Sequence, residues 1–299
     1  MYKNIAIQSL RSGLITNHEV HADVMRLDLM HPQVSGNKWF KLKYYLEAAI
    51  DQRAEGLVSF GGAYSNHLVA LAYACRQKGL KSSGIIRGEA PAQLNDSLKE
   101  MIACGMSLNF VSREAYRDKS GFRVKFIEQY PGYYPVDEGG RGELGVKGAG
   151  EILLQVPTAQ YTHILCAVGT ATTMAGLVNT SAVNQQVMGI SSLKVAHPAN
   201  NELLDYLKLR CNKHNYLLNF DYHFGGYAKK NTILLDFMQA FLQEENIPLD
   251  FVYTGKLFFA FTDLTMQGYF PRGSRILLIH SGGLQGNRSL RPSVRNTDF

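Results

Sequence analysis

The chain contains few cysteines, and none of them form the close pairs that bind zinc. Only four occur among its 299 residues, and they are widely spread: Cys75, Cys104, Cys166 and Cys211. This spacing argues against a disulfide framework and a zinc site, and reduced thiols are typical of the cytosol. The sequence also lacks any apolar run near the ~20 residues that a membrane-spanning helix needs. We therefore expect a cytoplasmic protein with no metal site and no membrane association.

A block of basic residues is also lacking. The net charge is +6, but the basic residues gather only weakly, at Arg288, Arg291 and Arg295. A nucleic-acid-binding surface would need a basic stripe interleaved with aromatic residues. We expect no nucleic-acid partner, whereas a mildly basic surface suits anionic small molecules.

The sequence does contain many glycines, which separate short apolar segments. It has 28 glycines against 9 prolines, and its 45% hydrophobic content is that of a globular chain with room for about two domains. Strands are predicted at residues 57–60, 85–86, 108–111, 164–168, 187–190 and 276–279, and helices at 39–49, 68–75, 94–104, 114–130 and from about 174 to 177. This alternation predicts an α/β fold of open parallel sheets covered by helices.

Two glycine-rich breaks, at residues 35–37 and 137–148, suggest crossings between two lobes. We expect a small α/β lobe at 45–140, inserted into a larger α/β lobe formed by 1–44 plus 141–299. Ligands of open parallel sheets bind beyond the carboxyl ends of the strands, and clefts between lobes commonly hold ligands. We therefore expect the active site in the cleft between the lobes.

Lys38 stands in an unusual place, directly after a polar turn and at the start of a helical pattern. A helix can hold a lysine in this position while the turn directs it into a cleft. Taken alone, a lysine is most often a solvated surface residue.

Two loops have the features of anion-binding sites. Gly169-Thr170-Ala171-Thr172-Thr173 follows an apolar strand and precedes a helix, where backbone N–H groups and the helix dipole favour a phosphate. It matches neither the Walker loop nor the dinucleotide fingerprint, so a single phosphate fits better than a nucleotide. Tyr64-Ser65-Asn66-His67 likewise follows an apolar strand and two glycines and precedes a helix, so it could hold a carboxylate. For both loops the alternative is an ordinary helix cap, since Thr, Ser and Asn are good N-caps.

A pyridoxal 5′-phosphate enzyme that acts on amino acids requires a lysine together with two anion-binding loops. Four motifs, in order along the chain, resemble the 1-aminocyclopropane-1-carboxylate (ACC) deaminase/D-cysteine desulfhydrase family. They are Ser-Gly-Asn-Lys at 35–38, Gly-Gly-Ala-Tyr-Ser-Asn-His at 61–67, the loop at 169–176 and Val-Tyr-Thr-Gly-Lys at 252–256. The resemblance runs from about Leu27 to Gly283. It implies the two-lobed fold-type II architecture, as in the tryptophan synthase β-subunit, and pyridoxal 5′-phosphate as the cofactor. We also expect a homodimer and a small amino-acid substrate.

The resemblance also implies roles for single residues. Lys38 corresponds to the lysine that forms the Schiff base, and Tyr253 and Tyr227 to active-site tyrosines. The implied cofactor contacts are Asn66 at the ring oxygen, Thr254 at the pyridine nitrogen, and Gly169, Thr170, Ala171, Thr172 and Thr173 at the phosphate. Ser65 corresponds to a catalytic residue near the substrate carboxylate, and we expect Tyr64 and His67 to line the substrate site. Family members often carry glutamine at the position of Tyr64, so a tyrosine there would narrow the pocket.

Thr254 bears on the choice of reaction. In ACC deaminases of this family a glutamate stands here, and a carboxylate would keep the pyridine nitrogen protonated. A threonine hydroxyl forms only a hydrogen bond, which suffices when the substrate carries its own leaving group. We therefore favour α,β-elimination from a small D-amino acid such as D-cysteine. The alternatives are ACC ring opening, an amino-acid racemase or dehydratase, and a non-catalytic protein that binds pyridoxal phosphate.

Overall fold

A computed structural model describes residues 4–11, 17–31, 34, 36–117, 124 and 127–290. The chain divides into two compact units: Met1–Asn37 with Ala149–Phe299, and Lys38–Gly148. The divisions fall at the two glycine-rich breaks of the sequence, although the predicted lobe boundaries lay at 44/45 and 140/141. Ser35, Arg291 and Arg295 lie outside the described residues.

The larger unit is built on a six-stranded sheet with the order β1-β2-β10-β7-β8-β9. Its strands are β1 (Ala6–Ser9), β2 (His21–Arg26), β7 (His163–Val168), β8 (Gln186–Ser191), β9 (Tyr216–Asn219) and β10 (Arg275–His280). All neighbouring strands pair in parallel except β1, which runs antiparallel to β2 at the sheet edge. The predicted open parallel sheet is therefore confirmed, with one antiparallel edge strand added.

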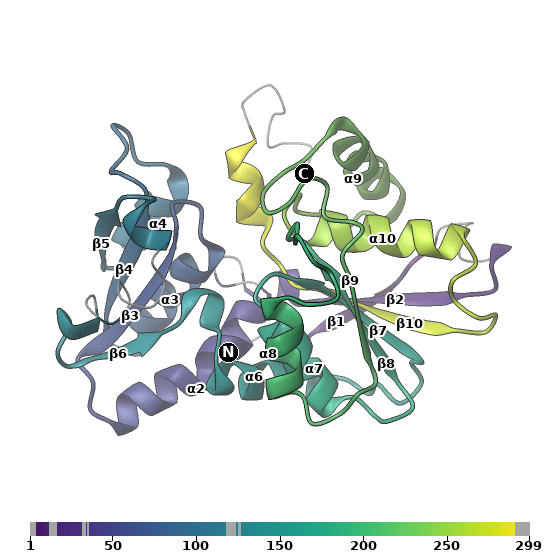
Figure 1. The fold of residues 1–299 in the computed structure, drawn as a ribbon, viewed down its shortest axis with the longest axis horizontal. Helices are drawn as coiled ribbons and strands as arrows, with labels where there is room; N and C mark the ends of the chain where they lie inside the picture. The colour runs from purple at the N-terminus through teal and green to yellow at the C-terminus, as the bar shows by residue number, and fades with distance from the viewer. Residues whose placement is uncertain are drawn as a thin grey trace. The chain divides into compact units, whose positions relative to one another are not determined.

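Helices cover both faces of this sheet. In Figure 1, α7 (Thr172–Thr180) and α8 (Glu202–Arg210) lie below it, and α9 (Thr232–Glu245) and α10 (Thr254–Met266) lie above it. The chain runs from β7 through β8 to β9 in one direction and then returns to place β10 on the other side of β7. Right-handed crossovers in opposite directions put their helices on opposite faces. The order therefore reverses between β7 and β10, the kind of switch point at which open α/β sheets bind ligands.

The core of the larger unit lies between the sheet and α10. Phe258 and Phe261 of α10 are buried against strand residues such as Leu165 and Leu278. Burying each such side chain contributes about 1.5–3 kcal/mol. This packing fixes the start of α10 relative to the carboxyl end of β7.

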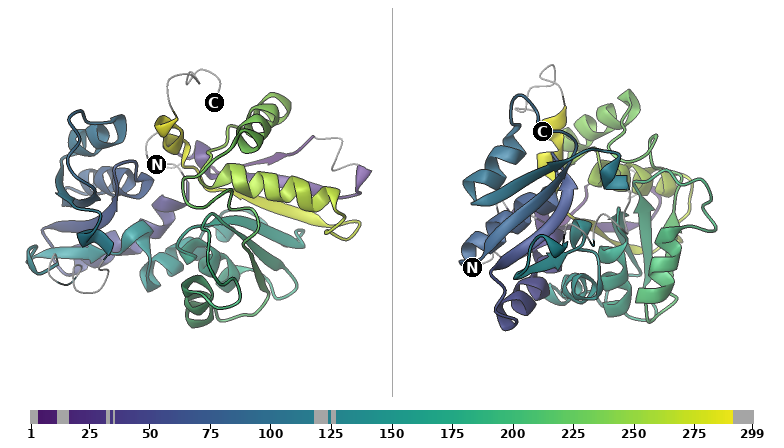
Figure 2. Two further views of the ribbon diagram at one scale, coloured as in Figure 1. Left: turned by 45° about the horizontal axis from the view of Figure 1, so that its top comes forward. Right: turned by 60° about the vertical axis from the view of Figure 1, so that its left-hand side comes forward.

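The smaller unit has a four-stranded sheet with the order β5-β4-β3-β6, parallel throughout. Its elements are α2 (Asn37–Asp51), β3 (Gly56–Gly62), α3 (Asn66–Gln77), β4 (Lys81–Arg87), α4 (Asp96–Ala103), β5 (Met106–Val111), β6 (Tyr133–Val136) and α6 (Glu143–Gly150), the last ending in the larger unit. α3 packs on β3 and β4, and α4 packs on β5; the sheet and its helices are seen from a second direction in Figure 2.

One predicted helix, at residues 114–130, is described only in part. The described residues include a 3-10 turn at Ala115–Arg117 and α-helical residues at 124 and 127–128, so they agree with the prediction in part. The remainder of that stretch lies outside the described residues.

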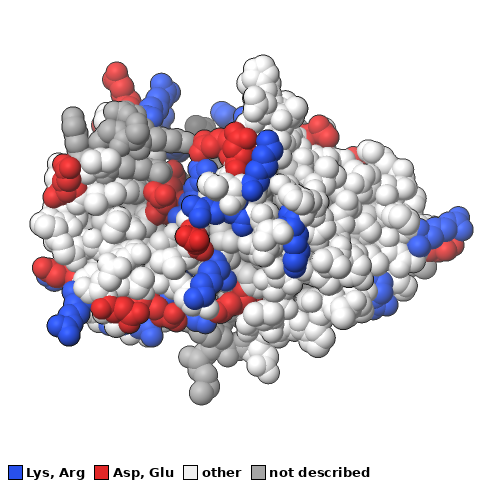
Figure 3. All heavy atoms as spheres, turned by 60° about the horizontal axis from the view of Figure 1, so that its bottom comes forward, with Lys and Arg blue, Asp and Glu red and all other residues white. Residues whose placement is uncertain are grey.

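The surface agrees with the dispersed charges of the sequence. On the face in Figure 3, acidic and basic side chains lie interspersed among uncharged ones. Within the described residues, no helix combines the length and the apolar character needed to cross a membrane.

Candidate active site

The amino end of α7 lacks the side-chain cap that four other helices of this chain have. α3, α4, α8 and α9 each begin after a residue whose side chain accepts a backbone N–H: Ser65, Asn95, Asn201 and Asn231. Before α7 stands Ala171, at a left-handed φ of 60°, with no side-chain cap bond. Thr172 and Thr173 lie inside the helix, so the alternative of a threonine cap is wrong. The first N–H groups of α7 are left for another acceptor, and an anion suits that position.

Hydroxyl groups surround this helix end. Thr170 Oγ1 and Thr172 Oγ1 are 3.1 Å apart. Thr173 Oγ1 accepts a hydrogen bond of 2.8 Å from Asn37 Nδ2. Three threonine hydroxyls at an uncapped helix end form a polar site that suits one phosphate group.

Asn37 is held at the switch point by the turn that follows β10. Its N–H donates to Ser281 O at 3.2 Å, while Gly36 N–H donates to Leu27 O at 2.9 Å. Gly36 has φ +81°, and a Cβ there would lie 1.8 Å from Ser281 O, so no other residue fits this approach. Lys38 is the next residue along the chain, in the first turn of α2.

Lys38, Lys41 and His67 form a basic group in the smaller unit. Lys41 lies one helical turn after Lys38 and is buried. Burial, and then the charge of Lys38, lower the pKa of Lys41 well below its usual value. Burial also lowers the pKa of His67, with smaller effects from both lysines. An unprotonated amine is the form that attacks a carbonyl, so this surrounding suits a lysine that bonds to a carbonyl cofactor.

His67 is held as a neutral ring. Ser59 Oγ donates to Val136 O at 2.7 Å, so it accepts from His67 Nε2, 2.8 Å away. The other ring nitrogen, Nδ1, is then an acceptor, and it is buried with no hydrogen-bond partner among the described residues. His67 can therefore accept one further hydrogen bond.

The loop between β3 and α3 combines a cap with exposed groups. Ser65 Oγ accepts the N–H of Leu68 at 3.2 Å, so the capping alternative is confirmed for Ser65, whose proton can still be donated. Asn66 is the first residue of α3. Tyr64 is 46% exposed, and Asn95 Nδ2 holds the loop by donating to Ala63 O at 3.2 Å.

Tyr227 and Tyr253 come together beside the loop after β7. Their ring centroids are 6.1 Å apart in an edge-to-face arrangement. A Cβ at Gly169 would lie 3.0 Å from Cε1 of Tyr253 and 3.2 Å from its hydroxyl oxygen. Glycine at 169 therefore lets the Tyr253 hydroxyl approach the predicted phosphate-binding loop.

The hydroxyl of Thr254 is already bonded to Asp250, a residue that the sequence analysis did not single out. Thr254 Oγ1 donates to Asp250 Oδ2 at 2.7 Å and accepts the Asp250 N–H at 2.7 Å. The carboxylate also accepts the N–H groups of Val252, Tyr253 and Thr254. Burial raises the pKa of Asp250, and these hydrogen bonds oppose the rise. Thr254 thus keeps one oxygen lone pair, but no proton, for another group.

His280 holds the turn after β10. Its Nε2 donates to Pro248 O at 2.7 Å, and its Nδ1 lies 3.3 Å from both the backbone nitrogen of Gly282 and Oδ1 of the buried Asp28. The ring is fully buried. These contacts fix the ring next to Ser281.

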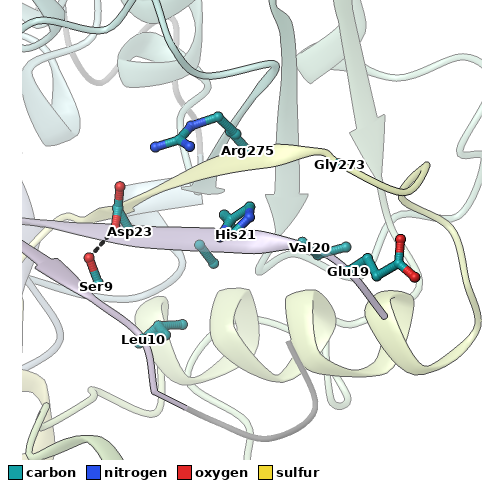
Figure 4. A pocket seen from close by; sticks show the side chains of 9 residues that line it. Ser9, Leu10, Glu19, Val20, His21, Asp23, Gly273 and Arg275 are labelled. Atoms are coloured by element: carbon teal, nitrogen blue, oxygen red, sulfur yellow. Dashed lines mark hydrogen bonds between the residues drawn. The ribbon is translucent and has the colours of Figure 1, made fainter. Parts of the chain in front are cut away.

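One surface hollow lies at the opposite end of the large sheet. It has a volume of about 570 Å³ and opens at the amino ends of β2 and β10, between Glu19, His21 and Arg275 (Figure 4). The nearby Asp23 carboxylate is bonded to Ser9 and Tyr161. This hollow therefore lies away from the switch point. No cluster of potential metal ligands occurs in the part of the chain that the structure describes.

Known proteins share this fold and these sequence features. The family model for pyridoxal-phosphate dependent enzymes matches residues 17–282. A Pyrococcus horikoshii protein provisionally named 1-aminocyclopropane-1-carboxylate deaminase is 28% identical, covering 90% of this chain and 87% of the relative. The bifunctional D-cysteine desulfhydrase/1-aminocyclopropane-1-carboxylate deaminase of Arabidopsis thaliana is 26% identical, covering 88% and 72%. The crystal structure of an ACC deaminase homologue superposes with a TM-score of 0.81, at 24% identity over 95% of this chain and 91% of the other.

These matches confirm the resemblance drawn from the four motifs, the fold-type II architecture and the cofactor. The polar site at the amino end of α7, with its uncapped backbone N–H groups and three threonine hydroxyls, suits the phosphate of that cofactor. The chain therefore belongs to the family of pyridoxal-phosphate-dependent enzymes.

Proposed function

We propose that the protein catalyses α,β-elimination from a small D-amino acid such as D-cysteine, releasing pyruvate, ammonia and the leaving group. The observation that carries this proposal is the neutral hydroxyl at Thr254, whose proton is committed to Asp250. A neutral oxygen stabilises a protonated pyridine nitrogen less than a carboxylate would, because the carboxylate adds the attraction between opposite charges to its hydrogen bond. Elimination of a good leaving group needs less electron withdrawal than opening a cyclopropane.

In this proposal Lys38 bonds covalently to the cofactor, and the residues from Gly169 to Thr173 hold its phosphate. Asn66 contacts the ring oxygen, and Thr254 lies at the pyridine nitrogen. The uncapped end of α7 and its hydroxyl groups support the phosphate assignment. When bound, pyridoxal phosphate supplies the electron sink that stabilises negative charge at Cα.

The side chains of the protein would bind the substrate and move its protons. The hydroxyl groups of Ser65 and Tyr64 bind the carboxylate of the amino acid, and His67 lines the same substrate site. Nζ of Lys38 takes the proton from Cα. The Cβ–S bond breaks with its electron pair on sulfur, and the Tyr253 hydroxyl supplies a proton to the departing thiolate.

Two features support this proton transfer. The free pKa of tyrosine, about 10, suits donation of a proton near neutral pH. Tyr227 packs edge-on against Tyr253 and limits its motion. Addition of one water then balances the products, since D-cysteine and water give pyruvate, ammonia and hydrogen sulfide.

A substrate comparison tests the proposal. Purified holoenzyme is incubated with D-cysteine, β-chloro-D-alanine, their L-enantiomers and ACC, and keto-acid release is measured. We expect pyruvate from the D-amino acids faster than 2-oxobutanoate from ACC. Faster turnover of ACC would instead favour ring opening, an activity that the name of the Arabidopsis relative joins to the first. Inverted chirality without keto acid would indicate a racemase, and a yellow protein with no turnover would indicate a binding protein.

We further propose that the enzyme works in the cytoplasm as a homodimer. Four free cysteines, two of them buried, are consistent with a reducing compartment. A mass measurement in solution tests the oligomeric state, and a monomer would contradict it.

A further inference from the structure

Lys256 is a buried lysine that the proposed chemistry does not use. It lies in the first turn of α10 with 0% exposure. A buried ammonium group is costly unless it is well hydrogen-bonded. Its Nζ donates to two backbone carbonyls at 2.8 Å each, His223 O and Gly226 O, and approaches Ser192 O at 3.5 Å.

Both close carbonyls belong to one irregular segment, residues 222–229, which we call the tyrosine loop because it carries Tyr227. Four of its residues have left-handed backbone: Phe224, Gly225, Gly226 and Ala228, with φ of 49°, 89°, 116° and 53°. Such conformations persist only where surrounding contacts enforce them. Lys256 supplies two of those contacts, and its partners His223 O and Gly226 O also accept the N–H groups of Gly226 and Lys229.

Other contacts hold the start of the tyrosine loop. The Tyr222 hydroxyl donates to Asp263 Oδ2 at 2.7 Å, and Phe224 packs on Phe259 with ring centroids 4.9 Å apart. Gly226, directly before Tyr227, is fixed by Lys256 from inside the protein. The middle of the loop therefore depends on the lysine more than its start does.

The same lysine is rigidly connected to Tyr253. Tyr253 is the N-cap of α10, and Lys256 follows it by three residues in the same helical turn. One ammonium group thus links the helix that positions Tyr253 to the loop that positions Tyr227.

We propose that Lys256 is a positioning residue that holds Tyr227 edge-on against Tyr253 through the carbonyls of the tyrosine loop. The inference rests on the proposed function, in which the two tyrosines serve proton transfer to the leaving group. Lys256 itself touches neither substrate nor cofactor in this account.

The link is expected to depend on pH. Burial lowers the pKa of Lys256 to about 8, and the nearby Asp250 carboxylate opposes the shift. The other ionisable side chains of the surrounding elements include Tyr222, His223, Tyr227 and Lys229 of the tyrosine loop, Lys194 beside Gly226, and Tyr253 and Asp263 of α10. Above pH 8 the neutral amine donates weaker hydrogen bonds, and the loop should loosen.

Hydrogen–deuterium exchange tests the structural part of the inference without activity. The peptide spanning residues 222–229 is followed in the holoenzyme for wild type, Lys256→Met, Lys256→Gln and the exposed control Lys229→Met. We expect exchange in this peptide to be at least about tenfold faster in Lys256→Met, intermediate in Lys256→Gln and unchanged in the control. Wild-type exchange, corrected for its intrinsic pH dependence, should also rise between pH 7 and 9.5. Unchanged exchange in both Lys256 variants and across this pH range would overturn the inference.

A double-mutant cycle tests the functional part. Lys256→Met should lower kcat for β-chloro-D-alanine by about tenfold or more, because small displacements of a proton-transfer group are costly, while KM stays within about twofold. Wild-type kcat should also fall above pH 8 as the loop loosens. In a Tyr227→Phe background the Lys256 substitution should cause no further loss, and this fall of kcat with pH should disappear. Independent, multiplying losses would refute the positioning role. If wild type turns over no amino acid, the proposed function fails, while the exchange experiment still decides whether Lys256 holds the loop.

Discussion

Gly36 forms the closest backbone approach at the switch point, and its role can be measured. Gly36→Ala would place a methyl group 1.8 Å from Ser281 O at a left-handed φ. Gly79→Ala is a matched control, because Gly79 also has positive φ but nothing lies within 4 Å of its added Cβ. We expect Gly79→Ala to lower the free energy of unfolding by about 1 kcal/mol and Gly36→Ala by at least about 3 kcal/mol.

Urea denaturation of the two variants measures the difference. Equal losses would mean that the turn after β10 yields easily, and that Asn37 is not firmly held there.

At the residue level, the sequence singles out side chains in distinctive loops but not the residues that support them in the structure. Lys38 was predicted as a site residue because a glycine turn precedes it, and Tyr253 because of its five-residue motif. Asp250 is signalled only by an acidic residue just before a helix, which is common at helix starts. Lys256 carries no local signal, since lysines are usually exposed; its burial depends on a distant loop folding over it.

The helix α7 makes a prediction at the level of the element. Ala171→Asp should add a side-chain cap to the open helix end and place a negative charge where we propose that the phosphate binds. Ala171→Asn adds a similar cap without the charge, and both side chains tolerate left-handed φ. We expect the Asp variant to weaken affinity for pyridoxal phosphate at least about tenfold more than the Asn variant, since an adjacent like charge opposes the anion.

Absorbance titration of the apoprotein gives both affinities. Equal affinities for the Asp and Asn variants would show that no anion binds at this helix end.

Among the elements, most central strands were predicted and most edge strands were not; the exceptions are the central strand β2, which was missed, and the edge strand β5, which was predicted at 108–111. Strands β3, β7, β8 and β10 are mainly apolar segments between glycines or polar turns, and β4 contains the buried pair Ile85-Ile86. β6 has only four residues, contains Pro135 and lies at a sheet edge, where proline is tolerated. β1 and β9 are also four-residue edge strands with exposed positions, so their composition resembles that of a loop.

For the whole molecule, the neutral buried His67 predicts loss of stability in acid. The folded protein holds the pKa of His67 well below 6.5 because the ring is buried near two lysines. The unfolded chain binds a proton near pH 6.5, so this contribution is complete above that pH and is lost as pH falls below it. The slope from this one group is at most about 1.4 kcal/mol per pH unit.

Chemical denaturation between pH 7 and 5 should therefore show a flatter pH dependence for His67→Asn than for wild type. The exposed His197 provides the control, and His197→Asn should keep the wild-type slope. A wild-type slope in His67→Asn would mean that other groups cause the acid sensitivity.

The most direct test of the account is the identity of the lysine that bonds to the cofactor. The yellow holoenzyme is reduced with borohydride, digested and analysed by mass spectrometry for a pyridoxyl-modified lysine. We predict a single modification on Lys38, and a colourless, unmodified Lys38→Ala protein. Modification of another lysine, such as the buried Lys41 one turn later or Lys256 in α10, would contradict the assignment of the site and the proton transfers built on it.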